Sequence, residues 1–144
     1  MNTIKVADLI LGNKGENKTI KWFNDNTFSK DKLGFYKNPY NVMDMCNSNN
    51  IMELKTRNIY HNQFYDIMIG YNKIKAAESN KNKDILYTML FLCKDGLYGW
   101  KYNPKQYTVR GGGRNDRGLD ERCDCAFIPH KFLYLITTEI NSIS

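Results

Sequence analysis

The sequence predicts an α/β (α+β) fold in which helices flank a mixed β-sheet. Three observations indicate it: an apolar helical period near the N-terminus, two strand-like runs around four small polar residues, and a largely apolar run at 85–93. The chain has 144 residues, of which 42% are apolar and 13% aromatic. This length fits one domain and this composition excludes intrinsic disorder, so we expect a single domain over residues 1–144.

The first two elements predicted are a helix and a β-hairpin. The helix is expected over 16–28, where apolar residues recur at helical spacing. The strands of the hairpin are expected at 40–46 and 51–57, on either side of the turn 47–50. Asn and Ser form this turn, and both tolerate the backbone conformations that a tight connection needs.

A second helix is expected over 60–79, because apolar side chains there fall on one face at helical spacing: Phe64, Ile67, Met68, Tyr71 and Ile74. The run 85–93 is typical of a buried central strand, and 97–102 of a second strand. The glycine- and arginine-rich stretch at about 110–118 predicts a flexible loop. The element order is therefore helix, hairpin, helix, strands.

The charge balance points to a polyanionic partner. The chain carries 21 Lys and Arg against 15 Asp and Glu, a net charge of +6, and a basic surface attracts nucleic acid. No apolar run approaches the ~20 residues that span a bilayer, and the N-terminus lacks a signal-peptide pattern. We expect an intracellular protein with no membrane partner. Frequent Asn, Lys and Ile, with A+T-rich codons, suggest a viral source and a location in the host cytoplasm or nucleus.

The expected hairpin register brings two carboxylates together. With a four-residue turn, Cys46 faces Ile51, and Asp44 then faces Glu53. One face of the hairpin is apolar, and the other carries Asp44, Glu53 and Lys55. Like charges at directly opposed positions destabilise a sheet. A divalent cation such as Mg²⁺, which takes oxygen ligands, removes this repulsion.

These groups suit phosphodiester hydrolysis. The carbonyl of Leu54 can add a third oxygen ligand, and Lys55 can hold a water or stabilise charge on a phosphate. Glu-x-Lys alone is a weak motif, since it also occurs at 16–18; the matching position of Asp44 distinguishes the second copy. The alternative is an ordinary amphipathic hairpin whose polar face meets solvent, with Lys55 neutralising one carboxylate.

The stretch Val42-Met43-Asp44, followed by Ile51-Met52-Glu53-Leu54-Lys55, resembles the core motif of the PD-(D/E)XK nuclease superfamily. The resemblance implies a restriction-endonuclease-like core and a phosphodiesterase that uses Mg²⁺, with Mn²⁺ as a substitute and without an organic cofactor. It also implies that Asp44 and Glu53 bind the metal and that Lys55 serves the attacking water. Met43 stands where many members have proline.

The resemblance adds two candidates outside the hairpin. Some members contribute a metal-binding glutamate from the first helix, for which Glu16 is the candidate. Others carry a glutamine and a tyrosine on the helix after the motif. Gln63 matches the glutamine, but Ile67 stands where the tyrosine would be.

Besides Gln63, four arginines are the expected nucleic-acid-binding residues. Arg57 extends the face of Lys55 by one step, while Arg110, Arg114 and Arg117 lie in or beside the glycine-rich loop. The planar guanidinium donates two hydrogen bonds to a phosphate, so a flexible arginine-bearing arm can grip a nucleic-acid backbone. A solvated surface loop is the simpler interpretation. No Gly-Lys-Ser/Thr follows the glycines, which excludes a P-loop.

Other candidates carry less weight. Cys123 and Cys125 are closer together than the cysteines of structural zinc sites. His61 is expected on the surface at the start of the second helix. Tyr60, Tyr65 or Tyr71 could stack on exposed bases, although aromatic residues at helical spacing usually belong to a core.

The leading hypothesis is a small Mg²⁺-dependent DNA endonuclease, structure-specific because one domain leaves little room for a separate recognition module. A homodimer would place two sites on two strands. One alternative is a non-catalytic nucleic-acid-binding or accessory protein with the same fold. Another is a structural protein of a virus-like element, whose charge aids packaging.

Overall fold

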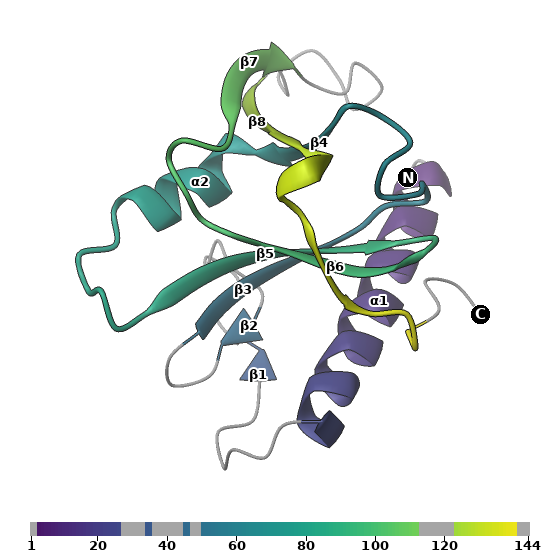
Figure 1. Ribbon diagram of the computed structural model, residues 1–144. Helices are drawn as coiled ribbons and strands as arrows, with labels where there is room; N and C mark the ends of the chain where they lie inside the picture. Colours follow the sequence, from purple (N-terminus) through teal and green to yellow (C-terminus); the bar gives the residue numbers. More distant parts are fainter. Residues whose placement is uncertain (1–2, 27–33, 36–44, 47–49, 113–122, 141–144) are drawn as a thin grey trace.

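The structure, a computed structural model, describes residues 3–26, 34–35, 45–46, 50–112 and 123–140. Within these residues it has two α-helices and two β-sheets, which confirms the predicted α/β class (Figure 1). The elements are α1 (Thr3–Asn26), β1 (Gly34–Phe35), β2 (Met45–Cys46), β3 (Asn50–Thr56), β4 (Asp66–Gly70), α2 (Tyr71–Glu78), β5 (Leu86–Cys93), β6 (Gly96–Lys101), β7 (Thr108–Gly112), β8 (Cys123–Pro129), a short 3₁₀ turn (His130–Phe132) and β9 (Tyr134–Thr137).

The larger sheet has six strands in the order β1-β2-β3-β5-β6-β9, and the smaller has three in the order β4-β8-β7. β3 and β5 lie parallel, because β4 and α2 carry the chain from the end of one strand to the start of the other. The remaining pairs in both sheets are antiparallel. No helix among the described residues is long and apolar enough to cross a membrane.

Both faces of the larger sheet are covered, so its central strand β5 is apolar along most of its length. On one face, Leu90 and Leu92 pack with Met52, Leu54 and residues of α1. On the other face, alternate side chains of β5 pack against α2 and the smaller sheet. Figure 1 shows α1 along one side of the sheet and α2 with β4, β7 and β8 on the other. The prediction of a buried central strand is confirmed.

The hairpin has the predicted register where the structure describes it. Met45 pairs with Met52 and Cys46 with Ile51. Met45, Met52 and Leu54 are buried together beneath α1, so the apolar face of the hairpin is also confirmed. Asp44, which directly precedes β2, lies outside the described residues, so its pairing with Glu53 stays a prediction.

The prediction of a second helix over 60–79 is wrong in its bounds. Residues 66–70 form β4, and α2 begins only at Tyr71. Alternation decides the strand: Ile67 and Ile69 are buried and lie opposite Ile128 and Ala126 of β8. The apolar residues at helical spacing therefore come from a turn, a strand and a helix, and do not form one helical face.

Two boundaries also differ from the prediction. The first helix spans 3–26 instead of 16–28, and its C-terminal half covers β3. Arg110, Gly111 and Gly112 belong to β7, which pairs with β8, so the predicted loop at 110–118 does not begin at Arg110. Residues 113–118, which include Arg114 and Arg117, lie outside the described part of the chain.

Candidate active site

The Glu53 carboxylate is buried in the larger sheet with two lysines beside it. Its side chain is 1% exposed, and its Oε1 lies 3.2 Å from Lys55 Nζ and 3.1 Å from Lys73 Nζ. β3 places Glu53 and Lys55 on one face because side chains two residues apart point the same way. Lys73 comes from the first turn of α2. The alternative of an ordinary amphipathic hairpin is wrong in placing Glu53 in solvent, but Lys55 does lie against this carboxylate as that alternative expected.

The charges explain why this carboxylate can be buried. Removing an ion from water costs several kcal/mol unless it is paired and hydrogen-bonded. Two ammonium groups lie against one carboxylate oxygen, so their combined charge of two exceeds the single negative charge of Glu53. The three side chains together therefore carry a net positive charge, which favours an anion such as a phosphate nearby.

Lys73 is the member of this site that sequence reasoning missed. The helix dipole disfavours a cation in the first turn of a helix, so α2 itself gives no reason for a lysine at position 73. The contact with Glu53 gives that reason. The side chain of Lys73 is only 15% exposed. Sequence reasoning missed Lys73 because it predicted one helix over 60–79. Lys73 faces β3 when the helix begins at Tyr71.

The other predicted metal ligands are less closely joined to this group. The side chain of Leu54 is buried beneath α1, while its carbonyl stands in the chain between Glu53 and Lys55. Glu16 lies on α1, which approaches β3 where Gly15 meets Thr56. Thr56 and Glu53 are three residues apart on a strand, so they point to opposite faces. No described contact joins Glu16 to Glu53, and its role stays a prediction.

The fit to a metal can be tested on the donors present. Within the described ranges, no group of three His, Cys, Asp or Glu side chains is close enough to hold an ion. Glu53 supplies one carboxylate of the kind that Mg²⁺ binds. The confirmed pairing of Met45 with Met52 leads to Asp44 as the next residue expected opposite Glu53. Glu53 thus fits as half of a carboxylate pair.

Residues 14–130 match the model of a protein family described as "Phage putative PDDEXK endonuclease". The matched region contains β2, β3 and α2, and so the whole group around Glu53. The chain belongs to this family. No curated protein matches the sequence significantly. The resemblance seen in the hairpin motif and the phage or viral origin are supported by this match.

In this member of the phage PDDEXK family, the structure describes two of the four arginines predicted to bind nucleic acid, Arg57 and Arg110. Arg57 Nη2 donates a hydrogen bond to the carbonyl of Met68, 3.0 Å away, and so links β3 to β4. Arg110 forms an ion pair with Asp66 at 2.7 Å, and its guanidinium lies 3.8 Å from the centre of the Phe127 ring. Contact of these arginines with phosphates stays a prediction.

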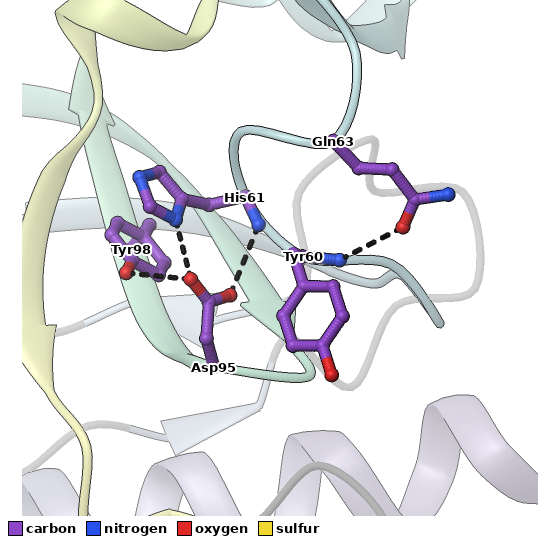
Figure 2. A network of polar contacts seen from close by, with 5 residues as sticks. All are labelled: Tyr60, His61, Gln63, Asp95 and Tyr98. Atoms are coloured by element: carbon purple, nitrogen blue, oxygen red, sulfur yellow. Dashed lines mark hydrogen bonds and ion pairs between the residues drawn. The ribbon is translucent and has the colours of Figure 1, made fainter.

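Gln63 is not on a helix, contrary to expectation. It lies in the segment between β3 and β4, where its side-chain oxygen accepts a hydrogen bond of 3.3 Å from the main-chain N–H of Tyr60. Figure 2 shows its side chain directed away from Asp95. Gln63 is exposed, so it remains accessible to a ligand.

His61 is not at a helix terminus either; it ties the segment after β3 to the turn between β5 and β6 (Figure 2). Its main-chain N–H donates to Asp95 Oδ1 at 3.0 Å, its Nδ1 contacts Asp95 Oδ2, and its ring stacks on Tyr98 with centroids 4.1 Å apart. The Tyr98 hydroxyl donates to Asp95 Oδ2 at 3.1 Å. Burial and this bond raise the pKa of Tyr98 to about 12, so it stays a donor.

Asp95 makes the contact between the segment after β3 and the turn between β5 and β6 sensitive to acid. Its burial acts to raise its pKa, but hydrogen bonds from His61 and Tyr98 outweigh burial and lower the pKa below its ordinary value. A lowered folded-state pKa contributes stability above the unfolded pKa of about 3.9, and this is lost as the pH falls through the folded-state value.

Replacing Asp95 by asparagine should therefore lower the free energy of unfolding at pH 7 by about 1–3 kcal/mol, because charge-assisted hydrogen bonds are lost. Urea unfolding from pH 7 to pH 3 should show the difference from wild type narrowing as the wild-type carboxylate becomes protonated. Asp84→Asn, at an exposed loop position, is the matched control. A destabilisation of equal size at every pH would contradict the assigned role of the Asp95 charge.

Proposed function

We propose that this protein is a Mg²⁺-dependent DNA endonuclease, active as a single-domain chain. Asp44 and Glu53 hold the metal and Lys55 positions the attacking water. The observation that carries the proposal is the buried Glu53 carboxylate on β3 with Lys55 and Lys73 at 3.2 and 3.1 Å. Membership in a phage PDDEXK endonuclease family supports it.

The bound ion would lower the pKa of its water and stabilise charge on the phosphate and leaving group. The residues of the chain have separate tasks. β3 is fixed between β2 and β5, so Glu53 is held in place by the sheet. Lys55 is 35% exposed and can turn towards a water or a phosphate oxygen, while the more buried Lys73 stays on Glu53. The second lysine thus keeps Glu53 neutralised when the first engages substrate.

Asp44→Asn separates cleavage from binding. Wild type should cleave DNA in Mg²⁺ or Mn²⁺ and not in EDTA, in a gel assay on supercoiled, linear, single-stranded and branched DNA. The variant should lose about 10²–10³-fold in rate, the scale seen when one preorganised electrostatic group is removed. Its DNA affinity in EDTA should be kept or increased, because a carboxylate that repels phosphate is gone.

Asp84→Asn is the control and should cleave like wild type. Binding without cleavage on every substrate, unchanged by metal, would contradict the proposal and support the non-catalytic accessory protein instead.

A further inference from the structure

Exposed aromatic side chains gather in the segment between β3 and β4. Seven large apolar or aromatic side chains are exposed in the described part of the chain, and three of them come from the six residues 60–65. Tyr60 is 53% exposed, Phe64 58% and Tyr65 71%. Single exposed apolar residues are ordinary on a protein surface, whereas three exposed rings within six residues point to an interaction site.

The backbone that carries these rings is held at three points. The N–H of Lys94 donates to the carbonyl of Ile59 at 2.8 Å, and the N–H of His130 donates to the carbonyl of Tyr65 at 3.0 Å. Between them, His61 is joined to Asp95. The rings are therefore exposed on an anchored segment, so binding to them requires little ordering of the backbone.

The charges around the segment favour an anion. Lys94 Nζ lies 5.6 Å from the centre of the Tyr60 ring, and the exposed Lys131 follows His130. Neither lysine has a carboxylate partner among the described residues. The carboxylates that flank the segment are both engaged, Asp66 with Arg110 and Asp95 with His61. Aromatic rings beside ammonium groups fit bases and phosphates, as in proteins that bind single-stranded nucleic acid.

The segment also lies near the candidate catalytic group. Tyr60 is five residues after Lys55, and a fully extended chain of that length spans at most about 17 Å. Stacked nucleotides rise about 3.4 Å each. The Cα atom of Tyr60 therefore lies within about 17 Å of the Cα atom of Lys55, a length that about five stacked nucleotides span. Bases inside an intact duplex are stacked on each other, so these rings can engage only unpaired or terminal bases.

We propose that residues 60–65 form a stacking platform for unpaired nucleotides beside the cleavage site. The preferred DNA then has a single-stranded segment next to a duplex, as in an overhang, flap or fork. This inference rests on the proposed function in taking DNA as the ligand and the group at Glu53 as the cleavage site.

The test measures binding by the full chain in EDTA, so that cleavage plays no part. Fluorescence anisotropy compares a blunt duplex with the same duplex carrying a single-stranded tail. Wild type should bind the tailed DNA about tenfold more tightly, and Tyr60→Leu, Phe64→Leu and Tyr65→Leu should each weaken binding of the tailed DNA by about fivefold or more. Binding of the blunt duplex should be unchanged. A 2-aminopurine in the tail should be quenched by wild type and not by the triple leucine variant.

Two controls show whether a weaker binding comes from loss of stacking, from loss of the tyrosine hydroxyl or from damage to the fold. Tyr60→Phe and Tyr65→Phe keep the ring and should retain the preference for a tail. Tyr134→Leu, at an exposed tyrosine of β9, should bind like wild type. Equal binding of tailed and blunt DNA by wild type, or equal losses on both in the leucine variants, would overturn the platform even if Mg²⁺-dependent cleavage is found. A tail preference without cleavage would uphold the platform and overturn the nuclease proposal.

Discussion

Replacing Glu53 by glutamine is expected to reduce DNA cleavage by about 10²–10³-fold while the chain stays folded. The amide has nearly the same volume as the carboxylate but cannot supply the negative charge that holds a divalent ion. Lys55 and Lys73 can turn their ammonium groups towards water, so the free energy of unfolding should change by less than about 2 kcal/mol.

Single-turnover cleavage in Mg²⁺, with urea unfolding of the same samples, measures both effects. Asp84→Asn makes the same chemical change at an exposed loop position and should retain wild-type cleavage. A Glu53→Gln protein that cleaves within about tenfold of wild type would exclude Glu53 from the metal site. If Glu53→Gln loses cleavage because it unfolds, Glu53→Asp is the second variant to measure. It keeps the negative charge and should recover part of the activity.

The second large effect concerns the two lysines on Glu53. Lys55→Met and Lys73→Met should each destabilise the fold by about 1 kcal/mol, since the remaining lysine still faces the carboxylate. The double variant removes both cations that the described structure places on Glu53. It should be destabilised by about 3–5 kcal/mol, the cost of removing the cations that lie against a buried charge.

A double-mutant cycle by urea unfolding measures this coupling. Lys75→Met, at an exposed position on the same helix, is the control and should have little effect. The prediction is contradicted if the cost in the double variant equals the sum of the single costs within about 0.5 kcal/mol, because independent sites add in this way.

The parts of the fold predicted from sequence are those fixed by short-range patterns. The register Met45 to Met52 follows from a turn count and from alternation, both properties of neighbouring residues. The strand β5 is recognisable because it is apolar on both faces. The closeness of Glu53 and Lys55 was predictable for the same reason, since both side chains lie on one face of one strand.

The parts that were missed depend on distant contacts. Ile67 and Ile69 alternate over only five residues of β4, and apolar neighbours at helical spacing competed with that pattern. The pairing of Ile67 with Ile128, far along the chain, decides in favour of the strand. Lys73 reaches Glu53 only because β4 sets where α2 begins, so no local motif could identify it. The stacking role considered for Tyr60 and Tyr65 was discounted because of the same error, since aromatic residues at helical spacing usually belong to a core, whereas both side chains are exposed.

The most direct test of the proposed metal centre is a titration of the protein with Mn²⁺, followed by electron paramagnetic resonance without DNA. Wild type and Asp84→Asn should bind the ion alike. Asp44→Asn and Glu53→Gln should each bind it more than about tenfold more weakly, since loss of a direct ligand should exceed the smallest losses seen for outer-shell partners. Equal Mn²⁺ binding by all four proteins, or no binding by wild type, would contradict a metal centre formed by Asp44 and Glu53.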